Sequence, residues 1–199
     1  MKDKKNVLKG KDLITIGIYS AIYFVLNFAC MLVSAFHPMI WILMPALIAL
    51  ITGIPFMLMC AKVQKCGAIL LMGMITGLLY FVTGQFTLLI LITFVLGCGL
   101  GEVFRGISQY NKFKANAIAF TFFSLGMIGS PLPIWVMRED FLKQIGESGM
   151  PTEYVLTLES ISSPSMLVVM FVATIICAVI GAVLAKGMFQ KHFVKAGIV

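Results

Sequence analysis

Few residue types in this sequence are capable of covalent chemistry, and they lie far apart. The chain of 199 residues contains 2 His and 5 Cys. It has no Gly-x-Ser-x-Gly elbow, no His-Glu-x-x-His pair and no phosphate-binding Gly-x-x-x-x-Gly-Lys-Ser/Thr loop. No two cysteines have the spacing of zinc ligands. We therefore expect no enzymatic activity and no cofactor bound directly by the chain.

Polar and aromatic residues are instead concentrated near one set of ends of the apolar segments described below. Side chains of these kinds are typical of a pocket for a small molecule. For the aromatic residues a second interpretation is open, because tryptophan and tyrosine also form belts at membrane interfaces. For Asn27 the alternative is a hydrogen bond between two helices. The candidates for substrate binding are Asn27, His37, Trp41, Tyr80, Gln85 and Trp135.

His37 and Glu102 each permit a further kind of chemistry. His37 and the nearby Met39 have the donor types of a soft-metal or haem site. A solvated histidine is the simpler interpretation, since the chain has 14 methionines and one close by is expected by chance. Glu102 lies three residues before Arg105, so it either contacts that side chain at the membrane boundary or relays protons. We expect no bound metal and a structural role for Glu102.

The composition decides which elements must position these residues. The chain is 60% hydrophobic and 12% charged, with a mean hydropathy of +1.03. Soluble domains carry about a quarter of charged residues. The composition therefore excludes a soluble enzyme, a nucleic-acid-binding domain and a disordered tail.

Six apolar segments are each long enough for a helix that crosses ~30 Å of hydrocarbon. They show no alternation of apolar and polar residues, which excludes the strands of a membrane barrel. We predict an all-α integral membrane protein, in which residues 1–199 form one compact bundle of six transmembrane helices. A long outer loop, 138–165, follows the fifth helix, and residues 139–147 of it have an amphipathic helical pattern. The predicted spans are 13–35, 39–61, 66–83, 86–104, 115–137 and 166–185.

The positions of the basic residues predict the orientation of this bundle. All of the 15 Lys and Arg residues except Arg138 and Lys143 precede the first span, follow the last, or lie in the second and fourth connections. Because cytoplasmic loops carry an excess of Lys and Arg, both termini are expected in the cytoplasm. The net charge of +7 is then a topology signal and requires no nucleic-acid partner.

Prolines and small residues mark two features of the spans. Pro45 and Pro55 should bend the second span, and the Pro131–Pro133 region should break the fifth near its outer end, which is typical of helices that line a cavity. Gly17-x-x-x-Ala21, with Ser20 beside it, forms a flat stripe on the first span. Such a stripe permits close contact with another helix, either of this chain or of a partner.

Three stretches of sequence resemble a known family. They are Lys11 to Ile14 at the start of the first span, Gly97 to Gly106 (GCGLGEVFRG) at the end of the fourth, and Ser124 to Gly126 in the fifth. Together with six spans and the small-residue stripe, they resemble the Trep_Strep, or MptD-like, group among the substrate-binding S components of energy-coupling factor (ECF) transporters. The resemblance covers essentially the whole chain.

This resemblance implies a function and a set of partners. An S component captures a vitamin or other micronutrient at the outer face of a prokaryotic cell membrane, here at Asn27, His37, Trp41, Tyr80, Gln85 and Trp135. A membrane-embedded coupling protein, or T protein, and two cytoplasmic ATPases supply the energy, so ATP is used by the partners. The family docks its coupling protein on the first helix, which corresponds here to Gly17, Ser20 and Ala21. The alternatives are an autonomous secondary transporter or channel and, less favoured, an intramembrane enzyme or assembly factor.

Overall fold

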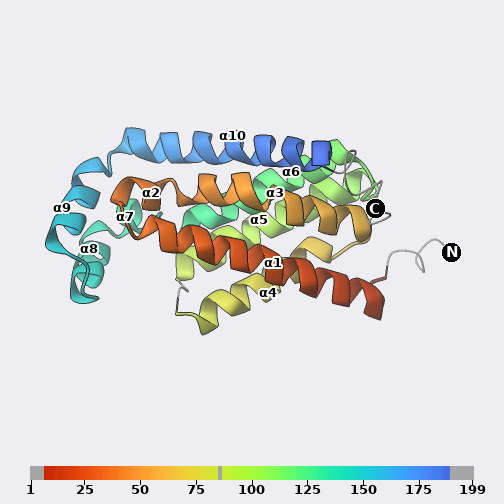
Figure 1. Cartoon of the computed structure of the whole chain (residues 1–199), viewed down its shortest axis with the longest axis horizontal. Coiled ribbons are helices and arrows are strands. Elements are labelled where there is room, and N and C mark those ends of the chain that lie inside the picture. Colours follow the sequence, from red (N-terminus) through yellow and green to blue (C-terminus); the bar gives the residue numbers. More distant parts are fainter. Residues whose placement is uncertain (1–6, 85–86, 189–199) are drawn as a thin grey trace.

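A computed structural model describes residues 7–84 and 87–188, and every regular element in them is helical. The long helices lie side by side, and the short helices gather at one end (Figure 1). The elements in chain order are α1 (Gly10–Ser34), α2 (Pro38–Ile42), α3 (Met44–Lys62), α4 (Ala68–Val82), α5 (Leu88–Ile107), α6 (Phe113–Gly126), the 3-10 turn η2 (Met127–Gly129), α7 (Pro133–Val136), α8 (Arg138–Glu147), α9 (Thr152–Ile161) and α10 (Pro164–Met188).

The six predicted spans correspond in position to the six longest apolar helices. Within the described residues, α1, α3, α5 and α10 are long and apolar enough to cross a membrane. The helices α4 and α6 are also apolar but have only 15 and 14 residues. The structure therefore contains four helices of full spanning length and two shorter apolar ones.

Prolines divide two of the predicted spans. The span 39–61 is split at Leu43 into α2 and α3, and Pro45 lies in the first turn of α3, where a missing N–H costs nothing. The span 115–137 ends as α6 and η2, and Pro133 begins the short α7. Pro55 lies inside α3, which continues past it. The expected breaks near Pro45 and Pro131–Pro133 are confirmed.

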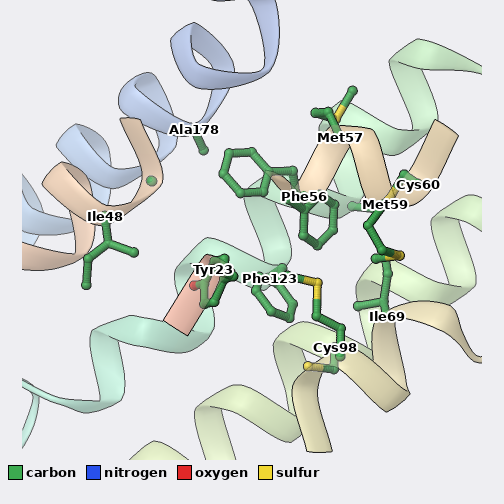
Figure 2. Packing of buried hydrophobic residues seen from close by; sticks show 14 of the residues in the cluster. Tyr23, Ile48, Phe56, Met57, Met59, Cys60, Ile69, Cys98, Phe123 and Ala178 are labelled. Atoms are coloured by element: carbon green, nitrogen blue, oxygen red, sulfur yellow. The ribbon is translucent and has the colours of Figure 1, made fainter. Parts of the chain in front are cut away.

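Helix α3 forms the centre of the bundle. It packs against α1, α6 and α10. In the most apolar 18-residue stretch of α3, 72% is buried, compared with 28% in the corresponding stretches of α1 and α10. Its Phe56 ring contacts the rings of Phe120 and Phe123, each at a centroid distance of 4.9 Å. Figure 2 shows Phe56 and Phe123 within the packed core. Gly53 of α3 meets Gly181 of α10 so closely that a Cβ at Gly53 would lie 2.5 Å from the carbonyl carbon of Gly181.

The outer surface of the bundle is apolar along the long helices. Ile14 and Val25 of α1, Leu78 of α4, Val95 of α5 and Val168 of α10 are each more than half exposed. An apolar surface this extensive is rare on soluble monomers but normal against lipid. The exposed surfaces of the long helices are therefore apolar enough to face lipid.

The segment 138–165, expected as a long loop with one amphipathic helix, is mostly helical. The expected helix is present as α8, and it ends before Gly149, whose φ of 86° favours glycine. A second helix, α9, follows Pro151 and was not predicted. Figure 1 shows α7, α8 and α9 at one end of the bundle, opposite the start of α1 and the end of α10.

Candidate functional site

A pocket of about 470 Å³ lies at the end of the bundle where α8 and α9 are found. Its lining comes from the last turns of α1, from α2, from the first turn of α5, and from α8 and α9. Four aromatic side chains form much of the wall: Phe28, Trp41, Phe141 and Tyr154. Pockets of this size and apolar character are typical of small-molecule sites.

The polar groups of this pocket are hydroxyls and amides. They are Ser34, Thr87, Ser130, Gln144 and Ser148, together with the phenol of Tyr154. Thr87 accepts the N–H of Ile90 at 3.2 Å and so also caps α5. Among the described residues, no Asp, Glu, Lys or Arg lines the pocket. Its chemistry is therefore that of an uncharged hydrogen-bonding site.

Two contacts attach the cover, α8 and α9, to the bundle across the pocket. The Trp41 and Phe141 rings stack with centroids 5.6 Å apart and an interplanar angle of 21°. The Tyr154 hydroxyl donates to the carbonyl oxygen of Ser34 at 3.4 Å. Burial raises the pKa of Tyr154, which keeps this hydroxyl protonated as a donor near neutral pH.

Arg138 and Trp135 fix the connection between α9 and α10. Arg138 donates from Nη2 to the carbonyl oxygen of Glu159 at 2.8 Å, and from Nη1 to that of Ser162 at 3.3 Å. Trp135 Nε1 donates to the carbonyl oxygen of Ser163 at 3.0 Å. These bonds tie Trp135 and Arg138 to carbonyls at the end of α9 and just before α10. Two of these carbonyls also accept a backbone N–H, that of Glu159 from Ser162 and that of Ser163 from Leu167. Trp135, expected in the substrate site, therefore anchors the cover and does not line the pocket.

Asn27 and Tyr80 are brought together, but inside the bundle. Both are buried, and the Tyr80 hydroxyl donates to Asn27 Oδ1, which joins α1 to α4. The Asn27 amide nitrogen lies 3.9 Å from the sulfur of Met127. Neither residue lines the pocket, whereas Met31 and Ser34, one and two turns further along α1, do. The helix–helix interpretation of Asn27 is the one that the structure supports.

His37 lies beside the pocket and not in its wall. Its Nδ1 accepts the N–H of Met39 at 3.1 Å, so the imidazole caps α2. It lines a smaller neighbouring pocket of about 260 Å³ together with Glu153 and Tyr154. Within residues 7–84 and 87–188, no group of three or more His, Cys, Asp or Glu could hold a metal ion. Of the remaining candidates, Trp41 lines the main pocket and Gln85 falls outside the described residues.

Sequence reasoning missed the half of the pocket that α8 and α9 supply. Phe141, Gln144, Ser148 and Tyr154 were not among the candidates, although all four line it. The available signal was the amphipathic pattern of residues 139–147, which puts Phe141 and Ile145 on one side of a helix. A helix with one apolar side outside the spans needs a surface to cover, and here that surface is the pocket.

The three residues expected to dock a coupling protein separate in the structure. Ser20 is buried, and its hydroxyl donates to the carbonyl oxygen of Ile16. Ala21 is exposed, and a Cβ added at Gly17 would meet nothing within 4 Å. By contrast, Ala178, Gly181, Ala182 and Ala185 are buried in α10. The small residues of α10 serve internal packing, while Gly17 and Ala21 face outward.

Glu102 and Arg105 bind the connection between α3 and α4. Glu102 accepts the N–H groups of Gly67 at 2.7 Å and Ile69 at 3.1 Å. Arg105, which is fully buried, donates to the carbonyl oxygen of Val63 at 2.9 Å and to Asn116 Oδ1 at 2.9 Å. The expected Glu102–Arg105 contact is not among the ion pairs of the described residues. The carboxylate thus caps the start of α4, which is a structural role.

These features define a multi-pass α-helical integral membrane protein with a pocket at one end of its bundle. The sequence matches the model of a family over residues 10–195, and that family is described as "Hypothetical bacterial integral membrane protein (Trep_Strep)". The chain belongs to this family, which confirms the resemblance to Trep_Strep proteins and supports a multi-pass membrane location. No curated protein and no solved structure matches the chain.

Proposed function

We propose that this chain is the substrate-binding S component of an ECF-type importer, which captures a vitamin or other micronutrient at the outer face of the cell membrane. The observation that carries the proposal is the pocket of about 470 Å³ between the helix ends and the cover formed by α8 and α9. A pocket near one end of a membrane bundle is suited to capture of a substrate from one side of the membrane. The described residues show no comparable arrangement for catalysis.

The proposed topology has six spans and cytoplasmic termini. The connections α3–α4 and α5–α6 carry Lys62, Lys65 and Lys112, while the α8–α9 cover carries an excess of acidic residues. Figure 1 places the cover at the end opposite the start of α1. The positive-inside rule then places the pocket on the outer side. The shorter α4 and α6 would span with local thinning of the bilayer or with help from flanking residues.

The energy for import would come from partners, a T protein and two ATPases that use ATP. The sequence has no phosphate-binding loop. Glu102, the one acid within a predicted span, has both carboxylate oxygens bound to backbone N–H groups. Both oxygens are thus engaged in charge-assisted hydrogen bonds at the start of α4, which favours a structural role over a relay of protons. This observation weighs against an autonomous ion-coupled transporter.

The outward side of α1 is the proposed docking surface for the coupling protein. Gly17 and Ala21 lie on it, and a Cβ added at Gly17 would meet no atom of the described residues within 4 Å. Without a hydrophobic driving force in lipid, helix association depends on close packing at small residues. The three-residue docking site is therefore reduced to Gly17 and Ala21, and Ser20 is left to internal packing.

Reconstitution with defined partners tests the proposal. The chain is co-expressed with the coupling protein and ATPases of its own bacterium, purified through an affinity tag, and assayed for ATP-dependent uptake in liposomes. We expect the G17L/A21L double variant to lose most of the bound coupling protein. The matched control is Ile22→Phe, which adds bulk at an exposed position elsewhere on α1. Flux by the chain alone under an ion gradient, or equal loss in both variants, would refute the proposal.

A further inference from the structure

The pocket has no charged side chain to meet an ionised ligand. The described residues that line it are aromatic, aliphatic, hydroxyl or amide side chains, with one glycine. The part of the wall that the structure describes therefore offers a ligand dipoles and apolar surface.

The charged residues that are close to the lining in the sequence, between Arg138 and Glu159, do not line the pocket themselves. Arg138 binds the carbonyls at the end of α9. Lys143 and Glu147, which flank Gln144 and Ser148 on α8, pair with each other at 4.0 Å and are 77% and 69% exposed. Glu153 lines the smaller neighbouring pocket. None of them provides a counter-charge at the wall of the main pocket.

This arrangement selects against ions. An ionised group that leaves water needs a paired charge or several directed hydrogen bonds to offset its lost hydration. Hydroxyls and amides offer neutral hydrogen bonds, which suit neutral polar groups better than full charges. A carboxylate or phosphate on a ligand would therefore weaken its binding here.

The shape of the wall favours a flat ring. Trp41 and Phe141 are stacked nearly parallel, at 21°, and both lie in the lining. Aromatic rings prefer offset-stacked or edge-to-face contact with other rings, and Phe28 and Tyr154 add further aromatic surface. Gln144 of α8, Ser148 directly after it, and Ser130 and Thr87 add hydrogen-bonding groups to the same lining.

We propose that this pocket binds a neutral, planar aromatic or heteroaromatic compound and discriminates against its anionic derivatives. This inference depends on the proposed function in one respect, namely that the bound compound is the substrate that the importer transports. The pocket chemistry itself follows from the lining residues and holds whether or not a coupling protein binds.

Matched probe pairs that differ in ionisation test this inference on the detergent-purified full chain. The pairs are nicotinamide and nicotinate, pyridoxine and its 5′-phosphate, and adenosine and its 5′-monophosphate. Binding is followed by tryptophan fluorescence, and Trp41→Phe identifies the signal from the pocket. We expect at least one neutral probe to bind, at least tenfold more tightly than its anionic partner, and the signal to be lost in Trp41→Phe. Any compound retained through purification is identified by mass spectrometry and should be neutral at pH 7.

A charge variant makes the test sharper. Gln144→Lys should move the preference toward the anion of each binding pair by at least threefold, while Lys143→Gln, which alters the adjacent exposed side chain, should leave it unchanged. Equal or tighter binding of the anions, binding of no neutral probe, or a signal unaffected by Trp41→Phe would overturn the inference. If the chain prefers neutral rings but does not associate with the T protein, the importer proposal is refuted and the inference about the pocket stands. If the chain associates with the T protein but prefers the anions, the inference about the pocket is refuted and the importer proposal stands.

Discussion

The crossing of α3 and α10 gives a quantitative prediction about stability. Gly53 and Gly181 permit the two backbones to touch, and a Cβ at Gly53 would lie 2.5 Å from the carbonyl carbon and 2.6 Å from the oxygen of Gly181. Since ordinary contacts of a Cβ are 3.4–4 Å, Gly53→Ala must separate the helices by about 1 Å. The buried Ala178 and Ala182 on the same face of α10 would lose contacts as well.

The expected cost is moderate and has a definite sign. Overpacking of this kind destabilises by about 1–3 kcal/mol, while replacing a mid-helix glycine by alanine regains about 0.5–1 kcal/mol. The difference spans about 0–2.5 kcal/mol. Because the added Cβ meets backbone atoms of Gly181 and not a flexible side chain, we expect a net loss of about 1–2 kcal/mol, or a fall in Tm of roughly 2–8 °C for a chain of this size. Thermal unfolding in detergent, followed by circular dichroism, measures it directly.

Gly17→Ala is the matched control for this prediction. The two glycines lie within apolar helices and receive the same methyl group, but a Cβ at Gly17 meets nothing within 4 Å. Gly17→Ala should therefore leave Tm unchanged or raise it by a few degrees, through helix propensity alone. Equal Tm values for Gly53→Ala and Gly17→Ala would show that the α3–α10 contact does not limit stability, and the packing argument would be wrong.

Two further predictions concern the ends of the bundle. Arg105→Met should destabilise the chain by about 3–5 kcal/mol, since it leaves buried carbonyls and Asn116 without a donor; chemical unfolding in detergent tests this, and unchanged stability would contradict it. Tyr154 should titrate above its usual pKa of 10.0, because burial disfavours the phenolate. The raised pKa means that the stability contributed by the phenol is present below pH 10 and lost as the pH rises further. Ultraviolet difference titration against Tyr154→Phe measures the midpoint, and a value at or below 10 would contradict the prediction.

The long helices could be predicted from sequence because hydrophobicity along the chain is a local property. The predicted start and end of the first span, 13–35, differ from α1 by only three residues and one residue. The break before α3 was also predictable, because Pro45 cannot occupy a helix interior without loss of a hydrogen bond. The helix α9 was missed because its ten residues are flanked by glycine and proline and carry only a short apolar pattern, in which Leu158 is the one buried residue.

The candidate site could be predicted only in part, because partners far apart in sequence decide where a polar side chain points. The amide of Asn27 had two plausible roles, and the hydroxyl of Tyr80, 53 positions away, determines which one it fulfils. Trp135 had the composition of a pocket residue, but its indole nitrogen binds the carbonyl of Ser163. The end of the bundle that holds the pocket was predicted, whereas the residues of its cover required the positions of α8 and α9.

The two ends of the molecule are held together by interactions of different kinds. At the basic end, buried Glu102 and Arg105 bind the α3–α4 connection through charge-assisted hydrogen bonds, which are the stronger kind. At the other end, α8 has no buried residue, and Arg138, which helps to anchor the cover, is exposed. Exposed contacts contribute little because water competes for them. The cover is held by apolar contacts as well, because Leu158 of α9 is buried in a cluster with Ile42 and Met170. Burial of apolar surface at this end thus takes the place that charge-assisted hydrogen bonds have at the basic end.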